Sequence, residues 1–265
     1  ELKKDVFFVD IRDSKALNNV FKIYKPNYVI HLAAKAEEIL SPFIRSSLYS
    51  VNIVGSANVI NACVNHNVDK IIFFSSIARF GDGTPPFTEE SPVNEKDCYA
   101  FSKTLIEKDL KEAYEHFGLN YSIIVPFNLF SPFQNFYSLY RNALAIFIRQ
   151  SITGEDITVY GDGNCVRSFS DCQYLCNPLE KLLTGFNGEM FNIGSSNPIT
   201  VLSAAQIVQS IASKRGFSPK IIHLEPRREV KVSYCDTSKA QKQLGLNDQT
   251  NLEETIDKMF DSALK

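Results

Sequence analysis

The sequence predicts an α/β fold in which helices cover a parallel sheet, and three observations support this prediction. Short apolar runs at 28–32, 70–74 and 121–125 are typical of strands that are buried on both faces. Stretches with helical patterns lie between these runs. Strands that alternate with helices at this spacing join parallel neighbours through right-handed crossovers.

The first half of the chain supplies most of the expected elements. Val6 begins a short β-rich run, and Asp13 stands where an N-cap would start the first helix. Gly118 stands where a helix that starts at Tyr99 would end. In chain order we expect strands at 6–9, 28–32, 70–74 and 121–125, and helices at 14–24, 52–67 and 99–117.

The second half of the chain has a different texture from about Leu129, where aromatic-rich loops replace the regular alternation. We expect helices at 140–150, 203–215, 237–244 and 251–264, and strands at 157–160 and 189–194. The pattern predicts a second, smaller α/β domain interleaved with the first. We therefore expect a first domain over 1–128, with a returning segment near 165–195, and a second domain over 129–265.

Composition excludes several classes of function. Hydrophobic residues make up 44% and charged residues 22% of the 265 residues, as in ordinary soluble globular proteins. The net charge of -2 predicts no general attraction to nucleic acid or to anionic membranes. No run of about 18 apolar residues predicts a membrane span, and the start of the chain has no signal-peptide pattern. We expect a cytoplasmic protein.

Cysteine and histidine spacing predicts no metal site. Cys172 and Cys176 lie one helical turn apart, but no nearby histidine or cysteine completes a ligand set. The six cysteines fit buried, reduced thiols of a reducing cytosol. His31 lies inside an apolar run, which favours a core histidine with a satisfied hydrogen bond.

Polar and small residues follow several of the expected strands at their carboxyl ends. They are Asp10, Ala33-Ala34, Ser75-Ser76 and the segment from Pro126 to Asn128. Ligands of parallel sheets bind beyond the carboxyl ends of the strands. The sequence therefore predicts one shared site at this edge, although small residues also fit simple tight packing.

Tyr99 and Lys103 are the candidate catalytic pair. Their spacing places both side chains on one face of a helix, one turn apart. An ammonium beside a phenol favours the phenolate and lowers a pKa that is ordinarily near 10. Such a pair can act as a general base toward an alcohol. The same spacing also occurs between two surface residues of a helix.

The chain resembles the extended short-chain dehydrogenase/reductases, and within them the nucleotide-sugar epimerases and dehydratases. The likeness runs from Val9 to the C-terminus and rests on nine motifs in the right order. The motifs are V-D-I-R-D (9–13), H-L-A-A (31–34), N-I-V-G-S-A-N-V (52–59), F-S-S-I-A-R-F-G (74–81), Y-A-F-S-K (99–103), P-F-N-L-F-S-P (126–132), V-R-S-F (166–169), F-N-I-G (191–194) and D-T-S-K-A (236–240). The resemblance implies a Rossmann-type doubly wound parallel sheet, NAD as the cofactor, a UDP-sugar as the substrate and a homodimer.

The resemblance also implies roles for individual residues. Tyr99 would be the acid/base, Lys103 would hold the nicotinamide ribose, and Ser76 would bond the reacting sugar hydroxyl. Ser76 is placed by counting back from Phe80-Gly81, where the family has Tyr-Gly. The implied cofactor residues are Asp10, Ile11, Leu32, Ala33, Ala34, Lys35, Asn52, Ser75, Tyr99, Lys103 and Pro126. The implied substrate residues are Ser76, Asn128, Arg167, Arg227, Arg228 and Ser233.

One departure from the family is the lack of its opening strand, G-x-x-G-x-x-G turn and helix, which bind pyrophosphate. The glycines at 81 and 83 precede Pro85-Pro86, and those at 161 and 163 precede a polar strand. We expect that an N-terminal strand–helix–strand unit is missing and that the sequence is a fragment. If the chain is complete, we expect neither tight NAD binding nor catalysis.

Two further departures concern the reaction and the substrate. Ser76 is followed by Ile77-Ala78, whereas the family's 4,6-dehydratases have Asp-Glu there to transfer a proton. This favours C4 epimerisation through a 4-keto sugar. Ser233 stands where hexose-restricted epimerases have a bulky Tyr, which favours a UDP-N-acetylhexosamine. Counting places Pro226 in the slot of a phosphate-binding arginine, with Arg227 and Arg228 alongside.

Other functions stay open at this point. One is another NAD-dependent dehydratase, dehydrogenase or reductase of the family. The other is a catalytically silent sugar-nucleotide binder or a non-functional fragment, favoured by the missing glycine turn.

Overall fold

The computed structural model describes residues 6–36, 38–138, 142–227 and 229–265. Contacts between residues divide the chain into two compact units. The first comprises Glu1–Ser75, Glu95–Ile124 and Leu183–Met190, and the second Ser76–Asn94, Val125–Leu182 and Phe191–Lys265. The predicted assignment of 1–128 to a cofactor and 129–265 to a substrate stays a prediction.

The first unit is built on a parallel sheet with the strand order β1-β2-β3-β8. Its strands are β1 (Tyr28–His31), β2 (Lys70–Phe74), β3 (Asn120–Pro126) and β8 (Glu189–Ile193), of which β3 and β8 continue into the second unit. The register pairs Ile71 with Val29 of β1 and with Tyr121 of β3, both in parallel. All five β2 residues are buried, as an apolar central strand requires.

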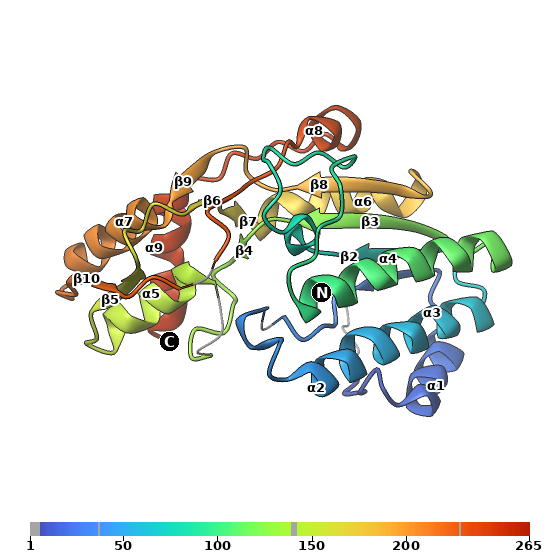
Figure 1. Ribbon diagram of the computed structural model, residues 1–265. Coiled ribbons are helices and arrows are strands. Elements are labelled where there is room, and N and C mark those ends of the chain that lie inside the picture. Colours follow the sequence, from blue (N-terminus) through green and yellow to red (C-terminus); the bar gives the residue numbers. More distant parts are fainter. Residues whose placement is uncertain (1–5, 37, 139–141, 228) are drawn as a thin grey trace. The chain divides into compact units, whose positions relative to one another are not determined.

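Three helices of the first unit, α1, α3 and α4, run side by side next to the sheet (Figure 1). They are α1 (Ser14–Tyr24), α3 (Ser56–Asn65) and α4 (Cys98–Phe117), and the short helix α2 (Arg45–Tyr49) precedes α3. Asp13 caps α1 by accepting from Lys15 N and Ala16 N, and Gly118 ends α4 with φ 72°. Both predicted caps are therefore confirmed.

Two expectations for the N-terminal strands are wrong. Residues 6–9 form no strand, and Phe8 is 99% exposed, because no described strand lies beside them to accept their hydrogen bonds. β1 is not buried on both faces, since Tyr28 and Ile30 are 42% and 41% exposed. β1 is an edge strand of the described sheet. An apolar sequence by itself suggests burial on both faces, and this is why the prediction was wrong.

The helix predicted at 52–67 begins earlier and is not uniform. The π-helix Ser50–Gly55 joins α2 to α3. A Cβ at Gly55 would lie 2.6 Å from atoms of the Ile11 side chain, so a larger residue would require that side chain to shift. π-helical turns inside helices often mark functional residues, and this one contains the buried Asn52.

The second unit contains several small sheets and the remaining helices. Its strands are β4 (Leu129–Phe130), β5 (Ile157–Tyr160), β6 (Val166–Ser168), β7 (Ser170–Asp171), β9 (Pro198–Thr200), β10 (Ile221–Leu224) and β11 (Val232–Ser233). Its helices are α5 (Ala143–Ile152), α7 (Val201–Lys214), α8 (Ser238–Leu244) and α9 (Leu252–Ala263), and α6 (Cys176–Thr184) reaches into the first unit. The start predicted for the helix at 140 lies partly outside the described residues.

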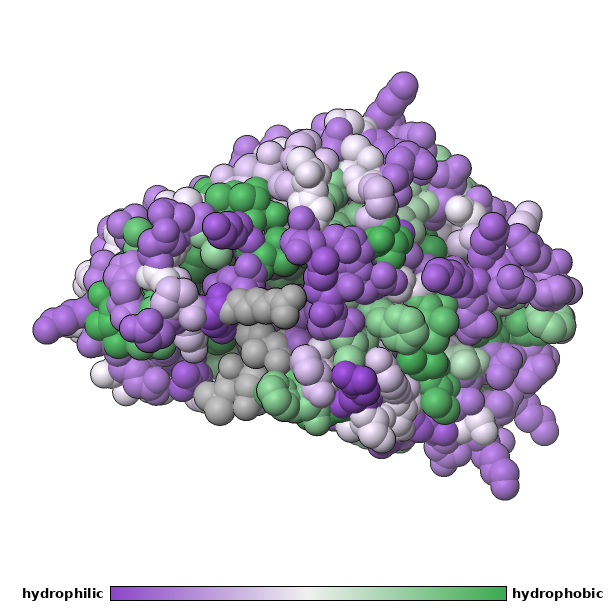
Figure 2. Space-filling view, viewed as in Figure 1, coloured by the Kyte–Doolittle hydropathy of each residue, from purple (hydrophilic) through white to green (hydrophobic). Residues whose placement is uncertain are grey.

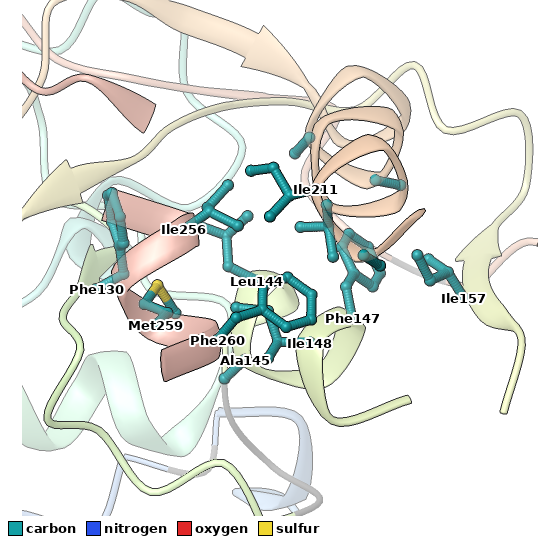
Figure 3. Packing of buried hydrophobic residues seen from close by; sticks show 14 of the residues in the cluster. Phe130, Leu144, Ala145, Phe147, Ile148, Ile157, Ile211, Ile256, Met259 and Phe260 are labelled. Carbon is teal, nitrogen blue, oxygen red and sulfur yellow. The ribbon is translucent and has the colours of Figure 1, made fainter. Parts of the chain in front are cut away.

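The core of the second unit lies between α5, α7, α9 and β5. Side chains such as Phe147, Ile211 and Phe260 point toward one another in it (Figure 3). Phe260 is fully buried, and the guanidinium of Arg215 lies 5.6 Å from its ring centroid. Burial of this apolar face, rather than helix propensity, stabilises these short helices.

No helix among the described residues is both long and apolar enough to cross a membrane. Hydrophilic residues predominate on the face drawn in Figure 2, with smaller hydrophobic patches between them.

Phe260→Ala tests the importance of the core between α5, α7, α9 and β5. Removal of the buried ring leaves a cavity, so we expect the free energy of unfolding to fall by about 3–5 kcal/mol. Urea titration followed by circular dichroism measures the change. Leu264→Ala is the matched control, because Leu264 follows the same helix but is 53% exposed. An equal effect of both substitutions would contradict the assigned core.

Candidate active site

Tyr99 and Lys103 lie on the first two turns of α4. The helix begins at Cys98, and its N-cap Asp97 accepts a hydrogen bond from Ala100 N at 2.9 Å. Tyr99 is 9% exposed and Lys103 5%. The Lys103 Nζ lies 5.9 Å from the centroid of the Tyr99 ring. The structure thus brings together the two residues that their spacing places on one helix face.

Lys103 is anchored to the carboxyl end of β2. Its Nζ donates a hydrogen bond to the Phe74 carbonyl oxygen at 2.8 Å and lies 4.9 Å from the centroid of the Phe73 ring. Burial lowers the pKa of Lys103 to about 8, and the charge of Glu107 acts in the opposite direction. Lys103 therefore stays mostly protonated at pH 7, close to its titration range.

Asn52 holds the segment that follows β1. Its side chain accepts from Lys35 N at 2.7 Å and donates to Lys35 O at 2.9 Å and to Ser102 Oγ at 3.1 Å. Ser102 is the neighbour of Lys103 in α4. Asn52 therefore ties the loop after β1 to the helix that carries the candidate pair, which fits the ordering role implied by the resemblance. Ser102 was not found by sequence reasoning, because its residue type carries no chemical signal.

His31 is a buried core residue, in agreement with the interpretation of the sequence. Its Nε2 lies 2.8 Å from Ser56 Oγ, and its ring centroid lies 5.7 Å from that of Phe73. Burial, and then the charge of Lys103, lower the pKa of His31 to about 4. His31 is therefore neutral at pH 7 beside the ammonium of Lys103.

Asp10, the predicted contact of the adenine end, is paired with a residue that the sequence did not single out. Its carboxylate binds the Arg12 side chain, with Arg12 Nη2 at 2.5 Å from Oδ2, and accepts from Arg12 N. These hydrogen bonds lower the pKa of Asp10 to about 2. The neighbouring Ile11 packs against Gly55.

The other predicted cofactor residues of the first unit differ in exposure. Leu32 is 61% exposed and Ala33 is exposed, whereas Ala34 and Lys35 are half-buried. Ser75 is buried and donates its hydroxyl to the Glu107 carboxylate. Glu107 was also missed by sequence reasoning, since a glutamate in an amphipathic helix ordinarily faces solvent.

Ser76 begins the second unit and is buried. It is the N-cap of the short 3-10 helix Ile77–Phe80, and its Oγ accepts from Ala78 N at 3.2 Å. This cap fixes the position of the Ser76 hydroxyl oxygen. The side chains of Ile77 and Ala78 carry no proton-transferring group.

Arg167 is held by the segment before β11. It donates to the carbonyl oxygen of Val230 at 2.6 Å and lies 3.5 Å from the Glu229 carboxylate. Arg227 lies 3.7 Å from the same carboxylate and 4.0 Å from the centroid of the Tyr160 ring. Glu229 thus joins two of the predicted phosphate-binding cations. The third, Arg228, lies outside the described residues.

Ser233 lies opposite Arg167 in the register of β11 and β6, and it is 9% exposed. Asn128 has φ 33° and donates from Nδ2 to Ser168 O at 2.9 Å. Pro126 is half-buried at the end of β3. The second unit therefore brings together Arg167, Arg227 and Ser233, while Tyr99, Lys103 and most predicted cofactor residues belong to the first unit.

Among the described residues, no cluster of histidine, cysteine, aspartate or glutamate side chains could hold a metal ion. All six cysteines are free thiols. Burial raises the pKa of Cys172 to about 11 and that of Cys63 to about 12, so both stay protonated at pH 7.

The residues of the first unit fit the nicotinamide-ribose end of NAD. An ammonium group carries three N–H donors, so Lys103 can donate to the Phe74 carbonyl and to a ribose hydroxyl at once. Over the ranges that the structure describes, no glycine-rich turn leads from the end of a strand into a helix. The described residues therefore supply no pyrophosphate cradle of that kind.

Comparison with known proteins confirms the family predicted from the motifs. The model of the "NAD dependent epimerase/dehydratase family" matches residues 1–194. The chain is 28% identical over 270 residues to "UDP-glucuronate 4-epimerase" of Thermodesulfobacterium geofontis, covering 97% of this chain and 79% of that protein.

Solved structures confirm the predicted Rossmann-type fold. UDP-glucose 4-epimerase of Thermotoga maritima, solved with UDP-glucose, matches with a TM-score of 0.91 and 25% identity over 97% of this chain and 84% of that one. UDP-glucose 4-epimerase of Thermus thermophilus, solved with NAD, matches with a TM-score of 0.88 and 25% identity over 96% and 83%.

His31 generates a prediction for the pH dependence of stability. Its pKa falls from 6.5 to about 4 on folding, so the unfolded chain binds more protons between these pH values. The free energy of unfolding therefore drops as pH falls from 6.5 to 4, by roughly 3 kcal/mol from this group. Urea unfolding at a series of pH values measures the drop.

His31→Gln should remove this contribution, so that its stability falls less steeply on acidification than that of the parent. His116→Gln is the matched control, because the His116 side chain is 67% exposed. The same pH dependence in parent and His31→Gln would show that His31 is not held neutral.

Proposed function

The chain belongs to the NAD-dependent epimerase/dehydratase family, and from this premise we propose that it epimerises a UDP-sugar at C4 through a 4-keto intermediate. The observation that carries the proposal is the buried pair of Tyr99 and Lys103, anchored by the 2.8 Å bond from Lys103 Nζ to Phe74 O. NAD held by Lys103 would supply a hydride acceptor and donor for C4, on which epimerisation with return of the hydride to the other face of the sugar depends.

Tyr99 acts as the acid/base of the reaction. As a phenolate it removes the proton of the 4-hydroxyl group, and as a phenol it later returns a proton to the same oxygen. Lys103, close beside the Tyr99 ring, stabilises the phenolate by its positive charge. Its remaining donors hold the nicotinamide ribose.

Ser76 orients the reacting hydroxyl group, and the residues after it restrict the reaction. Its hydroxyl oxygen has a fixed position because it caps the following 3-10 helix, and its O–H remains free to donate to the sugar. Ile77 and Ala78 cannot donate or accept a proton at the sugar. Elimination of water from the sugar needs such a group, so epimerisation is favoured over 4,6-dehydration.

Arg167 and Arg227 bind the diphosphate of the substrate, and Asn128 bonds a sugar or phosphate oxygen. Both arginines contact the Glu229 carboxylate, so the region already accommodates an anion between two cations. A diphosphate offers more negative oxygens than one carboxylate and forms stronger bidentate pairs with guanidinium groups.

We also propose that the enzyme acts as a homodimer.

A second candidate is a sugar-nucleotide binder without turnover. Arg167 and Arg227, which share the Glu229 carboxylate, would support binding of a nucleotide diphosphate without turnover. Calorimetric titration with NAD and with UDP separates the two functions: UDP binding without NAD binding supports the second. Net formation of NADH during turnover would instead indicate a dehydrogenase, because epimerisation regenerates its cofactor.

Tyr99→Phe tests the proposed acid/base. Loss of the phenol removes proton transfer, and we expect kcat for C4 epimerisation to fall by roughly 10²- to 10⁴-fold with little change in UDP affinity. Turnover is measured by chromatographic separation of the two epimers. Tyr114→Phe is the matched control on the same helix, since Tyr114 is 45% exposed. Unchanged kcat in Tyr99→Phe would refute the assignment.

Ser233→Tyr tests the size of the sugar pocket. A bulky ring at this buried position should exclude a 2-acetamido group, so we expect the ratio of UDP-N-acetylglucosamine to UDP-glucose turnover to fall roughly 10- to 200-fold. Parallel assays with both sugars measure the ratio. Ser233→Ala, which keeps the position small, should leave it unchanged. No turnover of the acetamido sugar by the parent would exclude this substrate class.

A further inference from the structure

The carboxyl end of β2 is tied to α4 at two consecutive residues. The Phe74 carbonyl accepts from Lys103 Nζ, and the Ser75 hydroxyl donates to the Glu107 carboxylate. Lys103 and Glu107 are one helical turn apart and share a face of α4. Ser75 is also held by its own backbone, because its N–H donates to Ile124 O at 2.8 Å. The two side-chain bonds and one turn of helix form a closed clamp.

Charged and titratable groups face Lys103 from two elements. His31 on β1 is neutral at pH 7 because its pKa is about 4, so it contributes no negative charge. Tyr99 lies on α4 and is uncharged until it ionises. Within the described part of the chain, Glu107 is the carboxylate whose charge raises the pKa of Lys103, against the effect of burial.

We propose that Glu107 is a positioning residue of the active site, whose carboxylate holds the end of β2 through Ser75 and serves as the counter-charge of the Lys103 ammonium. The proposal rests on the function proposed for Tyr99 and Lys103. It assigns two tasks to one carboxylate. An uncharged acceptor could hold Ser75 equally well, but only an anion adds an opposite charge to the Phe74 carbonyl and the Phe73 ring that also stabilise the ammonium.

Glu107→Gln separates the two tasks, because the amide oxygen still accepts from Ser75 Oγ but carries no charge. We expect the pKa of Lys103 to fall by about one unit in this variant. Ser75→Ala removes the hydrogen bond and keeps the charge, so the pKa of Lys103 should stay as in the parent. Glu107→Asp, which keeps the charge, should restore most of the shift.

The pKa is measured by NMR titration of the full chain with isotope-labelled lysine, the Lys103 signal being assigned by its loss in Lys103→Met. Lys70 is an internal reference, since burial lowers its pKa to about 8 as well and Glu107→Gln should leave it unchanged. Glu112→Gln is the matched control on the exposed face of α4. An unchanged Lys103 pKa in Glu107→Gln overturns the proposal.

If Glu107→Gln does not fold, the double variant Lys103→Met/Glu107→Gln decides. A counter-charge is needed only while the ammonium is present, so we expect the double variant to regain the fold. Lys103→Met alone is the control for loss of the bond to Phe74 O. A double variant that does not fold where Lys103→Met folds overturns the proposal, because Glu107 would then act without regard to Lys103.

Turnover distinguishes this inference from the proposed function. With Lys103 titrating at lower pH, the alkaline limb of the kcat profile should move to lower pH in Glu107→Gln. Absence of epimerase activity in the parent refutes the proposed function, whereas the NMR titration still tests the charge pairing. An active parent with an unshifted Lys103 pKa in Glu107→Gln refutes the inference alone.

Discussion

The hydrogen bond from the Lys103 ammonium to the Phe74 carbonyl is the interaction on which the first unit depends. Burial of an ammonium group costs several kcal/mol unless polar partners and opposite charge offset it. The offset here comes from one carbonyl oxygen, the face of the Phe73 ring and the charge of Glu107. Because these groups lie on β2 and α4, the strand and helix are held in one arrangement. The face of α4 that carries Tyr99 and Lys103 therefore also holds α4 against β2.

In the second unit, too, cationic side chains are offset by acceptors of the chain itself. Arg167 and Arg227 share the Glu229 carboxylate, and Arg167 also binds the Val230 carbonyl. Guanidinium groups keep their charge at any physiological pH, and these two are offset by a carboxylate and a carbonyl oxygen of the chain itself. Under the proposed function, the diphosphate of the substrate would take the place of these acceptors.

Local sequence patterns predicted the regular elements well wherever residues close in the sequence determine the local structure. Asp13 and Gly118 cap their helices as expected because a cap depends on residues within one turn. The predictions for 6–9 and for full burial of β1 were wrong, since strand pairing and cover come from distant segments. The π-helix at Ser50–Gly55 was also missed, and its Asn52 bonds Lys35, a residue distant in sequence.

The sequence by itself determined the fold class and the spacing of Tyr99 and Lys103, because strand–helix alternation and helical periodicity are local properties of the chain. Its motifs also determined the family by resemblance and, through the family, NAD as the cofactor. Only the tertiary structure decided which other residues, of types that signal no function in the sequence, support that pair. Ser102, Glu107 and Ser56 have ordinary residue types, and they matter because folding brings Asn52, Ser75 and His31 within hydrogen-bonding distance. Charge and burial at a site depend on such distant contacts, which no local pattern encodes.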